Sequence, residues 1–356
     1  MAARPACSAP GIRVDAEFEQ AGMAACRITA EGTVALTIRP ETSPINPSPW
    51  YAARLVQDGE RARIVQLLYD GAEHRYRPWL SVNGGRWHPI EVDASEGQGG
   101  SVTVRLPAFA GSAMLAAQPL LPLATVEATW SAQVQSGQVT MVTSGQSRDG
   151  RPVPWYRHGP PDAAHIHVFA ARQHPPETTG AVAFDAFADA LLAKQPAKAC
   201  PGHAFFFAPI LNPDGIARGH WRTNAGLTDL NRDWGRFAEP ETAAVGQAIV
   251  QAAASARLHS VLDFHSTRRD ALYTSNSASN AAQQFAKGVG AATGLTVVPT
   301  QAADGNTLKS WAERKFGTDA FTVELADAQS PDSAAAVGAK VAQLFMEKLA
   351  CPATGE

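Results

Sequence analysis

The strongest constraint on the fold is a change of pattern near residue 120. Before it, short stretches alternate apolar and polar residues, as at Val34, Leu36 and Ile38, and turn sequences such as Asp58-Gly59 separate the stretches. Alternation with a period of two is typical of a strand with one buried face, and several such strands in succession predict a small all-β sandwich. We therefore expect an N-terminal β-sandwich domain over residues 1–120 and a second domain over residues 121–356.

The second domain is predicted to alternate strands with helices. The predicted strands are residues 165–171, 204–211, 260–265 and 320–325, and the predicted helices are residues 182–192, 240–256, 281–292 and 333–349. This alternation predicts an α/β fold, in which a mostly parallel mixed sheet carries helices on both faces. Functional sites in such sheets lie at the carboxyl ends of the strands.

Composition excludes several classes of function. The 356 residues are 45% hydrophobic and 18% charged, which is ordinary for a globular protein. The formal net charge of −3 provides no basic field, so we expect no nucleic-acid partner. No apolar run approaches the roughly 20 residues that span a bilayer, so we expect no membrane insertion. The oligomeric state is left open.

The four cysteines bear on the cellular compartment. None forms a CxxC pair, so a cysteine zinc site is not expected. Their number fits two disulfides, Cys7–Cys26 and Cys200–Cys351, in an exported protein, and it fits four buried thiols in a cytosolic one equally well. The first six residues lack the apolar region of a signal peptide. We favour a periplasmic or secreted protein whose leader was removed, because Cys7 lies in a polar leading segment, and keep a cytoplasmic location as the alternative.

Polar side chains follow four predicted strands. His174 and Glu177 come after the first, Arg222 follows the second at a longer distance, His265 ends the third, and Glu324 lies at the end of the fourth. A packed sheet needs none of them there, so their convergence at one edge predicts a site. Two histidines and one glutamate with an open fourth position are the ligands of a catalytic zinc.

Several polar residues in these segments also have a simpler, structural interpretation. The His-x-x-Glu spacing alone is weak, and His265 could be a core histidine bonded to the backbone. Arg232 could form a surface ion pair, and Glu324 could be a solvent-facing charge. Asp263 could be a partner of a ligand or a satisfied buried carboxylate, and we leave it out of the catalytic set. The combination and order of the segments favour the metal site.

From about residue 120 onward the chain resembles the zinc carboxypeptidases of the carboxypeptidase A type. The matching motifs are His174-x-x-Glu177, NPDG at 212–215, Trp221-Arg222, DLNRDW at 229–234, DFHS at 263–266 and FTVELAD at 321–327. They occur in the family's order. The β-rich N-terminal segment, with PSPWY at 47–51, resembles the domain that precedes the catalytic domain in cytosolic carboxypeptidases and their bacterial relatives.

The resemblance implies a metal centre. His174, Glu177 and His265 would hold one Zn²⁺ per chain, and Asp229 would orient a ligand histidine and raise its basicity.

It also implies a catalytic and substrate-binding set. Glu324 would be the general base, and Arg222 would stabilise the oxyanion. Asn231 and Arg232 would bind the terminal carboxylate, a task that suits the planar guanidinium. The substrate would then be the C-terminus of a peptide or protein.

Two features depart from the family or refine it. No tyrosine occurs in residues 297–307, where the family has a mobile one, and Tyr273 follows the third ligand too closely to replace it. Lys309 falls near the position that lines the base of the specificity pocket, so it would favour a C-terminal Glu or Asp. The alternative is that Lys309 is solvated, as lysines on amphipathic helices more often are.

We therefore predict a zinc metallocarboxypeptidase. The alternatives are a murein-peptide amidase of the same fold, which cleaves glutamyl–diaminopimelate bonds, and a non-catalytic binding module. The module is disfavoured because ligands, base and oxyanion arginine are all present. Deacylation of amino acids on the related desuccinylase fold is disfavoured because Asn231-Arg232 and the NPDG segment fit peptides better.

Overall fold

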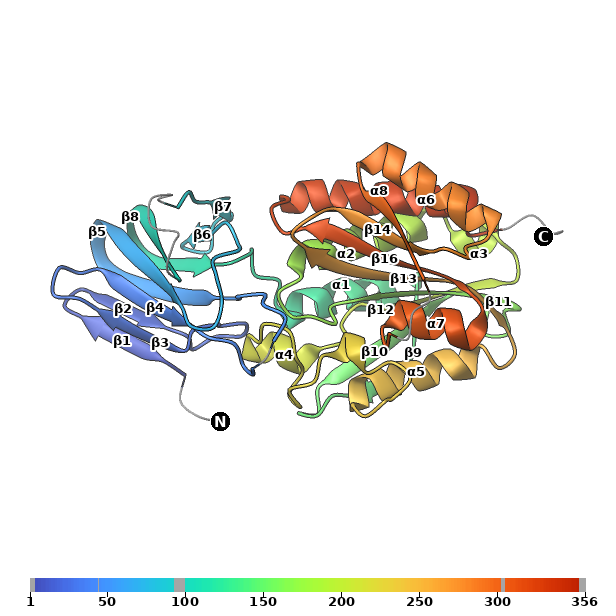
Figure 1. The fold of residues 1–356 in the computed structure, drawn as a ribbon, viewed down its shortest axis with the longest axis horizontal. Helices are drawn as coiled ribbons and strands as arrows, with labels where there is room; N and C mark the ends of the chain where they lie inside the picture. Colours follow the sequence, from blue (N-terminus) through green and yellow to red (C-terminus); the bar gives the residue numbers. More distant parts are fainter. Residues whose placement is uncertain (1–3, 44, 93–99, 302–304, 352–356) are drawn as a thin grey trace. The chain divides into compact units, whose positions relative to one another are not determined.

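A computed structural model describes residues 4–43, 45–92, 100–301 and 305–351. The chain divides into two compact units (Figure 1), the first made of Met1–Leu123 with Gly215–Thr223 and the second of Ala124–Asp214 with Asn224–Glu356. The segment Gly215–Thr223 therefore lies within the sequence of the predicted second domain but packs with the N-terminal unit. The sequence pattern did not predict that this segment belongs to the N-terminal unit.

The N-terminal unit is built on one hydrogen-bonded sheet. Its strands are β1 (Ala6–Ala9), β2 (Ile12–Asp15), β3 (Ala25–Ile28), β4 (Val34–Ile38), β5 (Ala52–Tyr69), β6 (Trp79–Val82), β7 (His88–Pro89) and β8 (Ser101–Ala116). The main path runs β1-β2-β5-β8-β6-β7, and β4 pairs with both β3 and β5. Among the described pairs only β4–β5 is parallel. The layering of this unit as a sandwich stays a prediction.

The second unit contains the predicted mixed sheet. Its strands are β9 (Thr140–Gln146), β10 (Pro152–His158), β11 (His165–Ala171), β12 (His203–Ala208), β13 (Arg257–Thr267), β14 (Ala271–Ser275), β15 (Thr296–Thr300) and β16 (Asp319–Ala326). Their order is β15-β14-β16-β13-β11-β12-β10-β9. The central strands β16, β13, β11 and β12 are mutually parallel, so their carboxyl ends meet at one edge. Antiparallel pairings attach β14 on one side and β10 on the other.

Helices lie on both faces of this sheet (Figure 1). They are α1 (Leu123–Gln135), α2 (Thr178–Ala193), α3 (Pro196–Ala199), α5 (Pro240–Ala252), α6 (Asn280–Thr293), α7 (Leu308–Phe316) and α8 (Pro331–Lys348). The short α4 (Pro213–Arg218) begins in the second unit, and its residues from Gly215 onward are assigned to the first. Alternate residues of β11 separate the two faces. Phe169 packs on Phe187 of α2 and Phe345 of α8, whereas Val168 belongs to the opposite core with Ile249 of α5. The predicted α/β class is confirmed.

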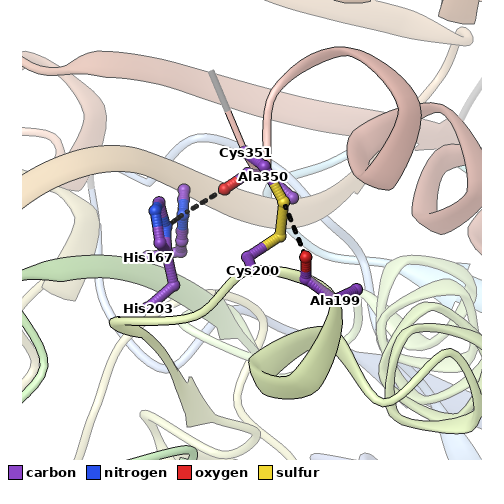
Figure 2. Close-up of a disulfide and its surroundings, with 6 residues drawn as sticks. All are labelled: His167, Ala199, Cys200, His203, Ala350 and Cys351. Carbon is purple, nitrogen blue, oxygen red and sulfur yellow. Dashed lines mark hydrogen bonds between the residues drawn. A yellow bond between two sulfur atoms is a disulfide. The ribbon is translucent and has the colours of Figure 1, made fainter. Parts of the chain in front are cut away.

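Both expected disulfides are present. Cys7–Cys26 joins β1 to β3, and Cys200–Cys351 joins the end of α3 to the residues after α8, with Cα–Cα distances of 5.8 and 5.6 Å. Figure 2 shows the second disulfide beside His167 and His203. Within the described ranges, no helix has the length and apolar character that crossing a bilayer requires.

Candidate active site

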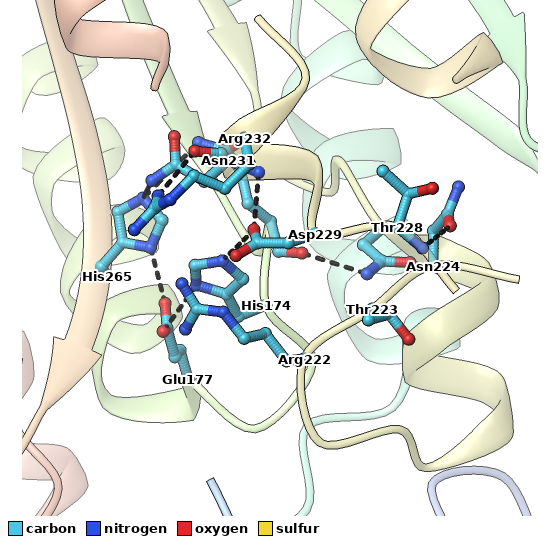
Figure 3. Close-up of polar contacts among 12 residues, drawn as sticks. His174, Glu177, Arg222, Thr223, Asn224, Thr228, Asp229, Asn231, Arg232 and His265 are labelled. Carbon is cyan, nitrogen blue, oxygen red and sulfur yellow. Dashed lines mark hydrogen bonds and ion pairs between the residues drawn. The ribbon is translucent and has the colours of Figure 1, made fainter. Parts of the chain in front are cut away.

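Three side chains that could hold a metal converge at the carboxyl ends of β11 and β13 (Figure 3). His174 and Glu177 lie in the turn between β11 and α2, and His265 lies near the end of β13. One ligand atom from each lies within 4.8 Å of the others, and all three side chains are buried. The structure thus brings together the three residues for which the sequence predicted a metal site.

Both imidazoles face Glu177 with their Nδ1 atoms. Oε1 of Glu177 lies 2.7 Å from Nδ1 of His174, and Oε2 lies 2.7 Å from Nδ1 of His265. The outer nitrogens face carboxylates, with Nε2 of His174 2.9 Å from Asp229 and Nε2 of His265 2.8 Å from Asp263. When each Nε2–H donates to its carboxylate, each Nδ1 lone pair points at the space beside Glu177.

The charges of this cluster shift its titration strongly. Burial alone would raise the pKa of Glu177, but the two imidazoles outweigh burial and hold that pKa well below its usual range. Burial alone would lower the pKa of His265, but Asp263 and Glu177 raise it well above the ordinary value. A buried carboxylate between two imidazoles is therefore stable here only with a positive charge close to it.

This donor set fits a divalent metal. Two imidazole nitrogens and one carboxylate are the protein ligands of catalytic zinc sites, and carboxylates on the outer nitrogens are their usual support. The buried charge pattern agrees, because a cation at this point would balance Glu177 and relieve the need for protonated histidines.

The register of the sheet places Glu324 next to the candidate ligand His265. It is directly opposite His265 in the parallel β13–β16 ladder. Its Oε2 is buried with no hydrogen-bond partner among the described residues. Burial raises the pKa of Glu324 to about 7, against the opposing effect of His265. A carboxylate with such a pKa can accept and return a proton near neutral pH.

Asp229, Asn231 and Arg232 come from one short turn. Asp229 precedes the 3₁₀ turn Leu230–Arg232 and accepts a hydrogen bond from the Asn231 N–H while contacting His174. The Asn231 amide nitrogen lies 3.3 Å from Nε2 of His265, and its oxygen accepts from the Leu308 N–H. Arg232 is exposed and donates to the Asn231 carbonyl. Their binding of a substrate carboxylate stays a prediction.

Lys309 is paired with a carboxylate of its own helix, and its contact with substrate stays a prediction. It is buried on α7, and its ammonium donates to Oε1 of Glu313 at 2.6 Å and to Thr300 at 3.0 Å. Glu313 follows Lys309 by four residues on the helix, so the pair was visible in the sequence. The positive charge expected at the base of a specificity pocket is thus balanced within the protein.

Arg222 is held by the N-terminal unit. It belongs to the segment Gly215–Thr223, and its backbone N–H donates to Glu41. Its role as the oxyanion arginine stays a prediction.

Comparisons with known proteins agree with this centre. The model of the succinylglutamate desuccinylase/aspartoacylase catalytic domain matches residues 166–349. The chain belongs to this family, which is of the zinc carboxypeptidase type. The matched residues include the three candidate metal ligands, Asp229 and Glu324. The matching model is that of the desuccinylase branch, which we disfavoured from sequence.

Curated relatives share part of the sequence, and solved structures share the fold. A cytosolic carboxypeptidase-like protein 5 of Ailuropoda melanoleuca is 35% identical over 99 residues, which are 27% of this chain but only 11% of that protein. A metallo-carboxypeptidase of Burkholderia cenocepacia has the same fold, with a TM-score of 0.80 at 19% identity over 95% of this chain and 98% of that one. A Pseudomonas aeruginosa metallo-carboxypeptidase in complex with (2-guanidinoethylmercapto)succinic acid gives 0.79 at 18% identity, over 94% and 98%.

The site contains two residues that the sequence analysis does not include in the catalytic set, Asp263 and Gln173. Asp263 is the carboxylate on His265, and Gln173 donates to Asp263 at 2.7 Å while accepting from Trp234. Asp263 and His265 are two apart on a strand, so they share a face. That spacing was the available signal. Nothing local distinguished Gln173.

Proposed function

We propose that this protein is a zinc-dependent metallocarboxypeptidase that hydrolyses the C-terminal amide bond of peptides. The observation that carries the proposal is the convergence of Nδ1 of His174, Nδ1 of His265 and the Glu177 carboxylate, with Glu324 opposite His265. Zinc, when bound by these residues, would supply the Lewis acidity that makes water nucleophilic near neutral pH.

The chain's own residues would do the rest. Glu324 would accept a proton from the attacking water and return it to the leaving amine, which its pKa of about 7 suits. Arg222 would stabilise the negative oxygen that develops on the carbonyl. Asn231 and Arg232 would bind the free terminal carboxylate and so restrict cleavage to the last residue.

The test combines metal analysis with a release assay. The native protein, Glu324→Gln and the surface control Glu347→Gln would be incubated with a peptide library and followed by mass spectrometry. We expect about one zinc per chain in all three proteins and release of single C-terminal residues by all except Glu324→Gln. Zinc without release from any peptide would contradict the peptidase, and absence of any bound metal would favour the non-catalytic binding module.

A second candidate is deacylation of an N-acylated amino acid. The match to the desuccinylase/aspartoacylase catalytic domain favours it. The same proteins would be given N-succinylglutamate, an N-acylaspartate and a murein peptide with a glutamyl–diaminopimelate bond. Turnover of an acyl amino acid in preference to every peptide would assign the deacylase, and turnover of the murein peptide alone would assign the amidase.

A preference for C-terminal Glu or Asp is a finer proposal that depends on Lys309. Its ammonium is bound to Glu313, so the preference requires the pair to open toward the substrate. Comparison of kcat/KM for peptides ending in Glu, Phe and Lys tests it, with Lys309→Ala as the variant. Equal values for the three peptides, or an unchanged preference in Lys309→Ala, would reject it.

We also propose a periplasmic or secreted location, with the cytoplasm as the alternative. Two disulfides support it, because such bonds persist in oxidising compartments. Fractionation of the source cells, with detection of this chain, would decide between the two.

A further inference from the structure

The segment Gly215–Thr223 is anchored in the core of the N-terminal unit. Trp221 is 2% exposed and belongs to the hydrophobic core formed by the strands of that unit. Gly219 has a positive φ, and a Cβ there would lie 2.1 Å from the carbonyl oxygen of Ala21. Only glycine permits this close approach of two backbones. The segment is therefore a fitted part of the N-terminal unit.

The Glu41 carboxylate accepts hydrogen bonds from the backbone of Arg222 and of the residue on either side of it; we call this arrangement the clasp. Its Oε2 accepts from the Trp221 N–H at 2.8 Å. Its Oε1 accepts from the N–H of Arg222 at 3.0 Å, from the N–H of Thr223 at 2.8 Å and from the Thr223 hydroxyl at 2.7 Å. One carboxylate thus satisfies three successive backbone donors, and hydrogen bonds to a charged acceptor are the strong ones.

The charge state of Glu41 suits this arrangement. Burial by itself would raise its pKa, but the N–H groups of Thr223 and Trp221 outweigh burial and hold the pKa below its usual range. The carboxylate is therefore ionised throughout the neutral range.

We propose that Glu41 is a positioning residue for Arg222. The inference rests on the proposed function, in which Arg222 stabilises the developing oxyanion. The reach of an arginine depends on where its Cα is held, and Glu41 binds the backbone N–H of Arg222 and of both its neighbours. Displacement of a catalytic group by about 1 Å can cost 100-fold in rate.

A double-mutant cycle tests the proposal. We would compare the native protein with Glu41→Ala, Arg222→Ala and the double variant. We expect Glu41→Ala to lower kcat about 10- to 100-fold with little change in KM or bound zinc. We expect the double variant to be no slower than Arg222→Ala alone, because Glu41 acts only through Arg222. Losses that multiply would overturn the proposal.

Two further variants guard against a merely structural effect. Glu41→Gln keeps the size of the side chain and one acceptor oxygen, and it remains informative if Glu41→Ala fails to fold. Asp15→Asn is the matched control, because Asp15 is also a buried carboxylate of this unit but binds Arg54. We expect Asp15→Asn to lower stability and leave kcat unchanged. A kcat loss in Asp15→Asn equal to that of Glu41→Gln would contradict positioning.

Amide hydrogen exchange separates this inference from the proposed function. Loss of the carboxylate should speed exchange of the Trp221, Arg222 and Thr223 amides at least severalfold in Glu41→Gln and not in Asp15→Asn. Unchanged exchange would overturn the clasp even in an active enzyme. Faster exchange in a protein that cleaves no amide bond would instead reject the proposed function, and the catalytic purpose of the clasp with it.

Discussion

His265 and Glu324 lie directly opposite each other on the neighbouring parallel strands β13 and β16. One is a predicted metal ligand and the other is the proposed base, so the register of a single ladder sets the distance between them. A shift of one residue would turn Glu324 to the other face of the sheet. The chemistry of this site therefore depends on the same hydrogen bonds that build the core.

Shortening the proposed base should slow the reaction without removing the metal. Glu324→Asp keeps the carboxylate but draws it back by one methylene, and we expect kcat to fall about 100-fold. Zinc content should be unchanged, because Glu324 is not a proposed ligand. The measurement is kcat with metal analysis, with Glu347→Asp on the exposed side of α8 as the control. Equal kcat values for native and Glu324→Asp would rule Glu324 out as the base.

Removing the charge on Asp263 should weaken zinc binding. The carboxylate accepts from Nε2 of His265 at 2.8 Å, and partners of this kind contribute about 10- to 100-fold in metal affinity. We expect a loss of that size for Asp263→Asn in competition with a chelator. Asp229→Asn should cause a comparable loss through His174, whereas the surface substitution Asp332→Asn should cause none. Native affinity in Asp263→Asn would show that His265 needs no carboxylate partner.

The free energy of unfolding should decrease as the pH is lowered, because of a histidine cluster near the amino ends of the central strands, away from the candidate active site. The cluster is made of His165, His167, His203 and His259, and the ring centroids of His165 lie 4.6 and 4.7 Å from those of His203 and His259. Burial lowers the pKa of His203 and His259 to about 4, with added repulsion from neighbouring histidines and, for His259, Arg257.

The sign follows from which state binds protons first. An unfolded histidine has a pKa near 6.5, so as pH falls from about 6.5 to 4 the unfolded chain takes up protons that the cluster resists. Stability should be complete above that range and be lost within it. Urea unfolding at successive pH values would measure this, and His259→Gln should make the dependence shallower. An equally steep decline in His259→Gln would place the acid sensitivity elsewhere.

Breaking the long-range disulfide should cost stability. Cys200 and Cys351 are 151 residues apart, so their bond restricts a large loop of the unfolded chain (Figure 2). We expect the Cys200→Ser, Cys351→Ser double variant to lose about 3–5 kcal/mol in the free energy of unfolding. Reduction of the native protein should cause at least this loss, because it breaks Cys7–Cys26 as well. A denaturant midpoint equal to that of the oxidised native protein would contradict this.

Sequence patterns predicted the centre of the second unit well. Strand 165–171 was predicted with the observed bounds of β11, and His174, Glu177 and His265 converge as expected. Both succeed because the information is local. A buried strand is recognisable from its own apolar run. His174 and Glu177 are only three residues apart in the sequence, in the turn that follows β11.

Other features depended on how the side chains are oriented, which the spacing of the residues alone does not fix. The spacing of Asp263 and His265 places both on one face of the strand, but only the orientation of the His265 ring shows that Asp263 is its partner. Lys309 was expected to meet substrate, and its pairing with Glu313 shows how a helical neighbour can balance a charge first.

By itself, the sequence determined the α/β class, the order of the polar segments and the candidate metal-binding side chains, because periodicity and short spacings are properties of neighbouring residues. Tertiary structure alone decided that Gly215–Thr223 leaves its own domain to pack with the N-terminal unit. It also decided that Glu41 clasps the backbone of Trp221, Arg222 and Thr223 across about 180 residues of chain. Those hydrogen bonds exist only after a core has formed around Trp221, and no local pattern records that core.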